Sequence, residues 1–418
     1  MIAIKAVDAW EILDSRGRPT IAATLVLDDG TTGTVSVPSG ASTGQAEAKE
    51  LRDGDRRFRG LSCQRAINHI RGPIAAALIH ETFETQDQLD AWLLQLDGTP
   101  DKSRLGANAL LAISLGFARA AAAYHHLELF EYFASLLPDV SPRLPAMTIN
   151  LFSGGKHASG QVAIQDVLIV PSSTSSIADG LAQMYDIYQE AAAILHRRYQ
   201  APALTADEGG LAPPFKKSAQ MLETAAEAIR AAGYELGQQV RLAVDLAASH
   251  FVTSAGLYQL DQETLSPEAL IDTVGSWARH YPIVSIEDGL SEDDWAHWPA
   301  LRRKLGDWSL TLADDLTCTN PTRIERAIDT GAANALLLKV NQIGTLTEAK
   351  QAYLLARSAG WRVSVSARSG ETEDNWLADL AVGWAGDFIK VGSITQSERL
   401  AKYNRLLQIE HTHPLLGK

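Results

Sequence analysis

Short apolar runs recur through the second half of the chain, separated by longer stretches in which apolar and polar residues mix. Runs of this length are typical of strands buried on both faces of a parallel sheet. They lie near residues 240–246, 281–288, 309–315, 336–341, 362–368 and 387–391. The charged residues near the ends of the first five, Asp245, Glu287, Asp314, Lys339 and Arg368, follow one another at intervals of 42, 27, 25 and 29 residues. Because a strand and its return helix occupy about 30 residues, the spacing predicts an α/β barrel, with room for extra structure in the longer first interval.

The first part of the chain has a different pattern. Residues 2–13 and 19–28 are rich in β-branched and aliphatic residues, and Asp29-Gly30 separates the second run from a third at residues 34–37. This arrangement predicts a three-stranded antiparallel meander. Residues 61–137 then show an alanine-rich helical pattern that ends in a cluster of prolines. We therefore expect an α+β domain at residues 1–138 and an eight-fold α/β barrel at residues 139–418.

Three polar loops and one further strand complete the pattern. Residues 38–44 (PSGASTG) are typical of a plain turn, although their hydroxyl and N–H groups are free to meet an anion or a metal. Residues 153–157 (SGGKH) lack the upstream glycine of a phosphate-binding P-loop. A strand predicted at residues 162–170 carries Gln165 and Asp166, and a helix through Tyr199 precedes the loop at residues 205–210 (TADEGG).

Composition narrows the class of protein. The chain has 418 residues and a net charge of −13, which argues against a general binder of nucleic acid or of anionic membranes. Charged residues from Lys5 onward interrupt the N-terminus too early for a signal-peptide core, and the most apolar stretch, residues 105–118, is too short to span a bilayer. Two cysteines give no disulfide framework. We expect a soluble, cytoplasmic protein.

The charged residues at the predicted strand ends carry the candidate chemistry. Asp245, Glu287 and Asp314 are all oxygen donors, a set that suits Mg²⁺ better than zinc. Three carboxylates gathered at one rim would repel one another, so a shared cation is the economical explanation. The alternative is that each carboxylate caps a helix or pairs with an arginine.

The next three strand ends carry cations, Lys339, Arg368 and Lys390. Two lysines close together and near a metal favour the neutral amine, which would lower the pKa of one of them toward that of a usable base. Arg368 with Ser369 suits a phosphate. A lysine base beside metal-binding carboxylates is suited to removing a proton α to a carboxylate. The alternative for Lys339 is that it simply extends from a strand end into solvent.

Motifs along nearly the whole chain resemble those of the enolase family. They are, in order, residues 14–20 (DSRGRPT), 38–44 (PSGASTG), 207–210 (DEGG), 285–288 (SIED), 314–317 (DDLT), 336–344 (LLLKVNQIG), 368–374 (RSGETED) and 397–404 (SERLAKYN). The resemblance implies an α+β N-terminal domain on an eight-fold α/β barrel, a dimer or higher homo-oligomer, two Mg²⁺ ions, and conversion of the small anionic substrate 2-phosphoglycerate to phosphoenolpyruvate and water.

The resemblance also implies roles for single residues. Asp245, Glu287 and Asp314 would bind the first metal, and Ser42 the second. Lys339 would be the base at C2, and Lys390 would hold the substrate carboxylate. Glu208 would act at the departing hydroxyl, with Asp166 also catalytic. Arg368 and Ser369 would hold the phosphate, while His157, in a lid loop, and Gln165 would contact the substrate.

The chain departs from the family pattern at several positions. Ala367 stands where the family has a histidine, Asp166 where it has glutamate, and Ser153 where it has asparagine. The segment at residues 391–399 (VGSITQSER) also differs from the family's Thr-Gly-x-Pro-x-Arg-Ser-Glu-Arg. The metal, base and phosphate groups are intact, whereas the groups around the departing hydroxyl are altered.

Three hypotheses follow. The first is an Mg²⁺-dependent enolase in which the departures are neutral drift. The second is an enolase paralogue that acts on another phosphorylated or phosphonate acid, such as a carboxyphosphonoenolpyruvate synthase. The third is a binding or structural protein with no catalytic activity, but the retention of three carboxylates and two lysines weighs against it, because an inactive site has no use for buried charges.

Overall fold

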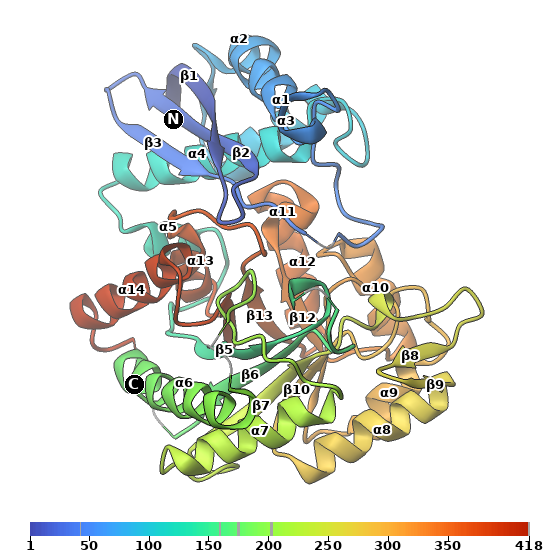
Figure 1. Cartoon of the computed structure of the whole chain (residues 1–418). Coiled ribbons are helices and arrows are strands. Elements are labelled where there is room, and N and C mark those ends of the chain that lie inside the picture. Colours follow the sequence, from blue (N-terminus) through green and yellow to red (C-terminus); the bar gives the residue numbers. More distant parts are fainter. Residues whose placement is uncertain (42, 159, 174–175, 201–203, 417–418) are drawn as a thin grey trace.

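The structure is a computed structural model that describes residues 1–41, 43–158, 160–173, 176–200 and 204–416. Eight strands close into a barrel in the second part of the chain, as predicted (Figure 1). In chain order they are β5 (Ala146–Ser153), β6 (Asp166–Pro171), β7 (Val240–Asp245), β10 (Ile283–Glu287), β11 (Leu310–Ala313), β12 (Ala335–Leu338), β13 (Arg362–Ser366) and β14 (Phe388–Gly392). The predicted fold class, an α/β barrel with an α+β N-terminal domain, is confirmed.

One barrel strand runs against the others, which the repeat in the sequence did not reveal. β6 pairs antiparallel with both β5 and β7, while the remaining neighbours are parallel. Asp166 opens β6 and lies opposite Asp245, which ends β7. Because β6 is reversed, its first residue therefore reaches the rim where the parallel strands end. We call this edge of the barrel the C-terminal rim.

Helices surround the barrel between these strands. They are α6 (Ile177–Tyr199), α7 (Ala219–Ala231), α8 (Pro267–His280), α9 (Trp298–Leu305), α10 (Pro321–Thr330), α11 (Val340–Ile343), α12 (Leu346–Ser358), α13 (Trp376–Gly383) and α14 (Ser397–Thr412). Local sequence sets several boundaries. Asn320 caps α10, whose first residue is Pro321, and Gly331 ends it in the left-handed conformation. The long first interval holds 3-10 helix η4 (Ala248–His250) and the hairpin of β8 (Tyr258–Leu260) and β9 (Glu263–Leu265).

The N-terminal domain contains the predicted meander and one more short strand. β1 (Ile2–Leu13), β2 (Pro19–Leu27) and β3 (Thr32–Ser36) pair antiparallel, and β4 (Thr82–Phe83) extends the sheet beside β1. The helices are α1 (Gln64–His69), α2 (Ala75–Leu78), α3 (Gln86–Asp97), α4 (Ala107–Tyr124) and α5 (Leu129–Ser135), with 3-10 helix η1 (Arg57–Gly60) and π-helix η2 (Ile70–Ile74). The predicted domain boundary, between residues 138 and 139, falls in the connection from α5 to β5.

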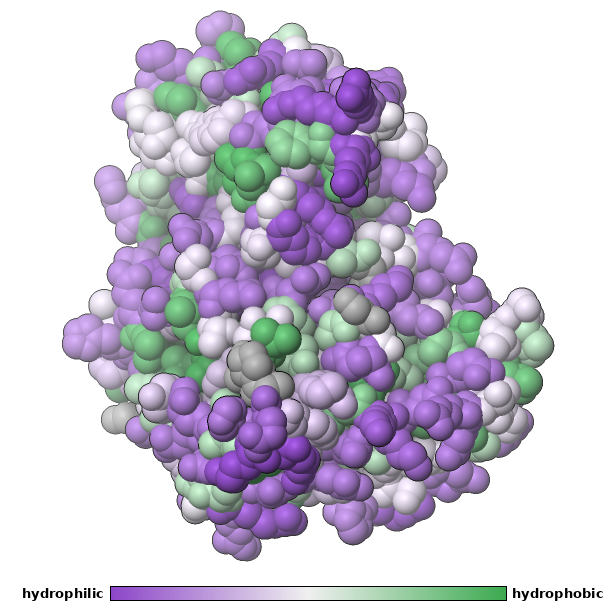
Figure 2. Space-filling view, in the orientation of Figure 1, coloured by the Kyte–Doolittle hydropathy of each residue, from purple (hydrophilic) through white to green (hydrophobic). Residues whose placement is uncertain are grey.

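Helix α4 is the core helix of this domain. By length and hydropathy it is the one helix among the described residues that could cross a membrane, but 83% of it is buried inside the structure. It packs on β2 and β3, where a Cβ added to Gly33 would lie 2.2 Å from the Gly116 carbonyl oxygen. Glycines at this crossing allow the helix to approach the sheet closely. The surface visible in Figure 2 is mostly hydrophilic, with apolar residues in small separate spots.

Two predicted strands have different bounds in the structure. The run at residues 336–341 leaves the sheet after Leu338, and Lys339 becomes the residue that precedes α11. The strand predicted at residues 162–170 begins only at Asp166, because the Val162 and Gln165 carbonyls accept hydrogen bonds from the loop residues Gly155 and Gly154. Both shifts place a predicted site residue, Lys339 or Asp166, at the end of a strand on the C-terminal rim.

The two domains meet through a buried polar contact. Asp90, in α3, is fully buried and accepts hydrogen bonds from the Thr347 backbone N–H and hydroxyl, at 2.9 and 2.7 Å, and from Gln86 at 3.1 Å. Burial raises the pKa of Asp90 to about 6, although these hydrogen bonds oppose the shift. The contact joins α3 to the start of the barrel helix α12.

The raised pKa of Asp90 predicts a pH-dependent stability. In the unfolded chain this carboxyl ionises near pH 4, whereas in the folded protein it keeps its proton until about pH 6. The contribution of Asp90 is therefore fully present below pH 4 and is lost as the pH rises to 6. Asp90→Asn should remove about 2–3 kcal/mol of this pH dependence in urea unfolding. The control is Asp87→Asn, at an exposed position of the same helix; identical pH profiles for Asp90→Asn and the unmodified protein would contradict the assignment.

Candidate active site

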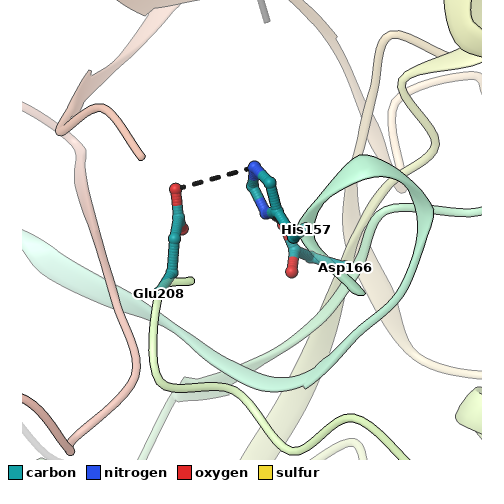
Figure 3. A group of neighbouring side chains, drawn as sticks. All are labelled: His157, Asp166 and Glu208. Atoms are coloured by element: carbon teal, nitrogen blue, oxygen red, sulfur yellow. Dashed lines mark ion pairs between the residues drawn. The ribbon is translucent and has the colours of Figure 1, made fainter. Parts of the chain in front are cut away.

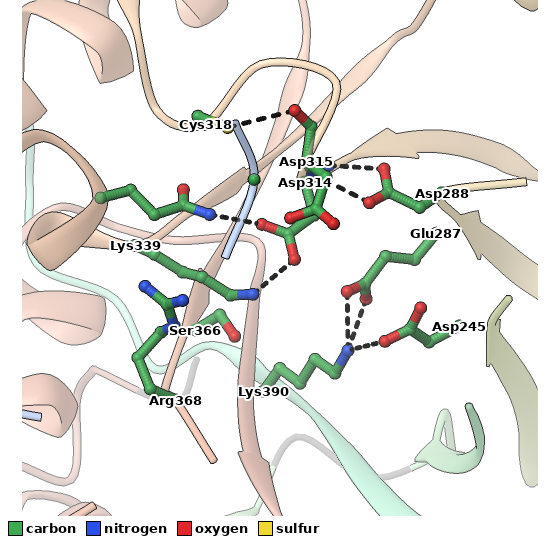
Figure 4. A network of polar contacts seen from close by, with 12 residues as sticks. Asp245, Glu287, Asp288, Asp314, Asp315, Cys318, Lys339, Ser366, Arg368 and Lys390 are labelled. Atoms are coloured by element: carbon green, nitrogen blue, oxygen red, sulfur yellow. Dashed lines mark hydrogen bonds and ion pairs between the residues drawn. The ribbon is translucent and has the colours of Figure 1, made fainter. Parts of the chain in front are cut away.

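Two carboxylates and one lysine form the centre of the C-terminal rim. Asp245 and Glu287 end the neighbouring strands β7 and β10 and lie side by side in the register. Lys390, in β14, reaches them from across the barrel: its Nζ lies 2.8 Å from Asp245 Oδ2 and 2.7 Å from both Glu287 oxygens (Figure 4). All three side chains are buried. The lysine ammonium is thus the counter-charge of two carboxylates.

A second pair lies beside the first. Asp314 follows β11, and Lys339 follows β12, the next strand of the barrel. Lys339 Nζ donates to Asp314 Oδ2, and Gln342, in α11, donates to Asp314 Oδ1 at 2.8 Å (Figure 4). The structure therefore brings together three predicted metal ligands and the two lysines at the neighbouring strand ends.

The carboxylate partners of the two lysines oppose a lowered pKa in this structure, and the lowering expected for one lysine beside a bound metal stays a prediction. Burial lowers the pKa of Lys339, but the Asp314 carboxylate outweighs this effect, and the pKa is raised above its ordinary value. Burial likewise opposes the charge of Lys390, yet Asp245 and Glu287 raise its pKa well above the ordinary value. The sequence places both lysines at strand ends but does not show that each contacts a carboxylate.

The three carboxylates fit a hard divalent cation. Asp245, Glu287 and Asp314 offer only oxygen atoms, which Mg²⁺ prefers and which zinc prefers less than histidine or cysteine. Burial and the neighbouring Asp245 raise the pKa of Glu287 well above its ordinary range. Additional positive charge at this position would therefore stabilise the ionised carboxylates. Ser42, the predicted ligand of a second metal, lies outside the described residues.

Two further carboxylates, Asp288 and Asp315, lie beside Asp314, and the sequence analysis did not assign them to the site. Asp288 accepts the backbone N–H groups of Asp314 and Asp315 at 3.0 and 2.9 Å, so it holds the turn that presents Asp314. Ligand atoms of these three residues lie within 4.8 Å of one another. Asp288 also has a φ of 43°, a strained conformation directly after Glu287. The only signal in the sequence was the adjacent acidic pairs, Glu287-Asp288 and Asp314-Asp315.

A second polar cluster combines His157, Asp166 and Glu208 (Figure 3). His157 lies between the two carboxylates: its Nδ1 is 3.5 Å from Asp166 Oδ2, and its Nε2 is 4.0 Å from Glu208 Oε1. Burial lowers the pKa of His157, but Glu208 and Asp166 outweigh it and raise the pKa to about 9. The imidazole is therefore cationic at neutral pH.

Two residues of β5 hold these carboxylates in place. Asn150 donates to Glu208 Oε2 at 3.1 Å, and Ser153 donates to Asp166 Oδ1 at 2.6 Å. Ser153 and Asp166, both departures from the family pattern, are thus direct partners. The sequence analysis identified each departure separately and missed Asn150 altogether. Their contact indicates that the shorter Asp166 is held by a hydroxyl group suited to its length.

The predicted phosphate-binding residues lie where the N-terminal domain covers the rim. Arg368 donates to both oxygens of Glu47, at 3.0 and 3.1 Å, and to Asn341 at 3.0 Å. The Ser369 hydroxyl accepts hydrogen bonds from Arg16 and from the Ala41 backbone N–H, at 3.1 and 2.8 Å. The two loops that carry Arg16 and Ala41, after β1 and after β3, therefore form one wall of the site. Glu47 is a further residue that the sequence analysis missed.

One small cavity lies between these groups. Its volume is about 20 Å³, room for roughly one water molecule. Ala367, the third departure, lines it and contributes no polar group. The predicted site residues that line it are His157, Gln165, Glu208, Asp245, Lys339, Arg368, Ser369 and Lys390. Gln165 donates to Asp245 at 3.0 Å, whereas Asp166, Glu287 and Asp314 do not line the cavity.

The fold and the site define a class: a barrel enzyme whose C-terminal rim gathers lysines and carboxylates beneath an α+β domain. Residues 4–133 match the family described as enolase, N-terminal domain, and residues 141–414 match the enolase C-terminal TIM barrel domain. The chain is also 45% identical over 412 residues to a protein named Enolase from Mycobacteroides abscessus, which covers 99% of this chain and 95% of that relative. The chain belongs to the enolase family of hydro-lyases.

Proposed function

We propose that this protein converts 2-phosphoglycerate to phosphoenolpyruvate and water in an Mg²⁺-dependent reaction. The observation that carries the proposal is the pairing of Lys339 and Lys390 with three buried carboxylates at the C-terminal rim of an enolase-family barrel. The relative at 45% identity, named Enolase, supports the same substrate. The reaction belongs to central carbon metabolism, and we place it in the cytoplasm.

Asp245, Glu287 and Asp314 would hold the metal, and Ser42 would contribute to a second ion. Bound there, Mg²⁺ would supply positive charge next to the substrate carboxylate, where negative charge develops when the C2 proton leaves. Lys390, which contacts two of these carboxylates, would bind the substrate carboxylate from the opposite side. Arg368 and Ser369 would bind the phosphate, with His157 and Gln165 contacting the substrate near the lid loop.

Lys339 and Glu208 would move the protons. The Lys339 amine takes the proton from C2, and the electron pair left on C2 is delocalised into the carboxylate. Glu208, held by Asn150, would then give the C3 hydroxyl a proton supplied by the neighbouring cationic His157, and the hydroxyl would depart as water as the double bond forms. Asp166 and the cationic His157 would set the position and charge of Glu208.

The proposed partners are few. The substrate is a small phosphorylated anion, and the surplus of negative charge over the whole chain disfavours nucleic acid or an anionic membrane as a ligand. We propose a homodimer or a higher homo-oligomer as the working form.

The direct test of the proposed reaction is turnover by purified protein. With 2-phosphoglycerate and Mg²⁺, absorbance of the enol product should rise; excess EDTA should abolish the rise, and added Mg²⁺ should restore it. Full activity in excess EDTA would contradict the metal assignment. No product under any of these conditions would contradict the substrate.

A second candidate function is supported by three of the four departures. Ser153 and Asp166 form a hydrogen-bonded pair next to Glu208, and Ala367 adds space to the site cavity. These changes affect the groups that expel the C3 hydroxyl and leave Lys339 unchanged. A paralogue that acts on a bulkier phosphorylated or phosphonate acid would therefore retain proton removal at C2. Carboxyphosphonoenolpyruvate synthase is an example of such an activity.

The enolase and the paralogue hypotheses predict different ratios between the rate of C2 proton exchange and the rate of dehydration of 2-phosphoglycerate. If the departures alter the second step, exchange of the C2 proton of 2-phosphoglycerate with solvent deuterium should persist while dehydration is on the order of a hundredfold slower than in an ordinary enolase. Ala367→His with Asp166→Glu should raise dehydration, more so with Ser153→Asn because residues 153 and 166 are in contact. Lys339→Ala is the control that should abolish exchange. Ordinary rates in the unmodified protein would show that the departures are neutral drift.

A further inference from the structure

A large cavity opens on the barrel face opposite the C-terminal rim. Its volume is about 520 Å³, within the range of small-molecule pockets. It lies where β5, β11, β13 and β14 begin and where the reversed strand β6 ends, next to the start of α6. Arg362 opens β13, and Arg368 lies six residues further along the chain, just after the strand ends. Because an extended strand rises about 3.3 Å per residue, this cavity is roughly 20 Å from the proposed phosphate site. We call it the floor cavity.

The floor cavity has apolar walls. Met147 and Phe388 come from neighbouring strands of the barrel, Ile177 from the first turn of α6, and Leu416 from the last described residues of the chain. Met147 and Ile177 are almost completely buried, whereas Ala146, which opens β5, is exposed to the cavity. An apolar ring or a short chain could pack against these side chains.

Positive charge is in excess at one side of this cavity. Asp387 is contacted by three arginines: Arg357 at 2.5 Å, Arg362 at 2.7 Å and Arg143 at 3.4 Å. It also accepts the Val363 backbone N–H at 2.9 Å. Burial raises the pKa of Asp387, but this N–H and the arginines outweigh the effect and lower it, so the carboxylate is ionised. Three guanidinium groups share one negative charge, which leaves two positive charges uncompensated by Asp387.

Arg143 and Arg362 face the cavity and are available to a ligand. They line it together with Asp387, and their side chains are 52% and 60% exposed. Arg143 makes the longest of the three contacts with Asp387, at 3.4 Å, and donates to the Ala385 carbonyl at 3.2 Å, so turning it toward a ligand would break two long contacts. The N-terminus of α6 does not add to this charge, because Glu410 already accepts the N–H groups of Ile177 and Ala178 at 2.7 and 3.1 Å.

We propose that the floor cavity binds a small organic anion. The carboxylate or phosphate head would contact Arg143 and Arg362, whose planar guanidinium groups suit both kinds of oxyanion. The apolar body would pack on Ala146, Phe388 and Leu416, which keep exposed surface along the cavity. This site is separate from the proposed catalytic groups and binds its ligand whether or not 2-phosphoglycerate is the substrate.

The test uses three probes with one apolar body: 2-naphthoate, 2-naphthyl phosphate and the neutral 2-naphthamide. Isothermal titration calorimetry of the full chain should show saturable binding of at least one of the two anions, and the tighter one identifies the preferred head group. 2-Naphthamide should bind about tenfold more weakly than the preferred anion, because it makes no charge-assisted hydrogen bond. Binding of neither anion, or equal binding of the amide, would overturn the proposal.

Two variants locate the binding. Arg143→Gln should weaken the preferred anion about tenfold, and Ala146→Phe should block it by filling the cavity. The matched control is Arg241→Gln, an exposed arginine near the start of β7 that does not line the cavity and should leave affinity unchanged. Anion binding that survives both Arg143→Gln and Ala146→Phe would place the ligand elsewhere and refute the proposal. Turnover of 2-phosphoglycerate should be the same in all three variants, which separates this test from that of the proposed reaction.

Discussion

Five titratable side chains gathered at the C-terminal rim constrain the rest of the molecule. Asp245, Glu287 and Asp314 are buried carboxyl groups, and Lys339 and Lys390 supply positive charge at hydrogen-bonding distance that favours their ionised forms. Each residue lies on or directly after a different strand, so the pairing requires the barrel to close in one register. The N-terminal domain then completes the site, since Arg16 and the Ala41 N–H contact Ser369 across the domain boundary.

Much of this arrangement could be predicted from the sequence, because strand spacing and strand ends are local properties. Regular intervals between Asp245, Glu287, Asp314 and Lys339 place one charge per strand, and parallel strands bring their ends to one rim. The meander was equally local, set by alternating residues around Asp29-Gly30. The reversed direction of β6 was not visible in the spacing, although the resemblance to a known family already assigned Asp166 to the site.

Contacts between side chains on different strands could not be predicted. Nothing near Lys390 in the sequence shows that its ammonium reaches Asp245 and Glu287 across the barrel, and this contact raises its pKa. The supporting roles of Asp288, Asn150 and Glu47 depend likewise on which side chain faces which. Ser153 and Asp166 are 13 residues apart, and only the antiparallel pairing of β5 with β6 makes them partners.

The central claim is that the rim charges stabilise one another, and a double-mutant cycle tests it most directly. Urea unfolding in EDTA would be measured for Lys390→Met, Glu287→Gln and the double variant. Lys390→Met alone should cost about 3–5 kcal/mol, because it leaves two buried carboxylates without their counter-charge. The double variant should lose about 1–3 kcal/mol less than the sum of the single losses. Losses that add within about 0.5 kcal/mol would contradict the account.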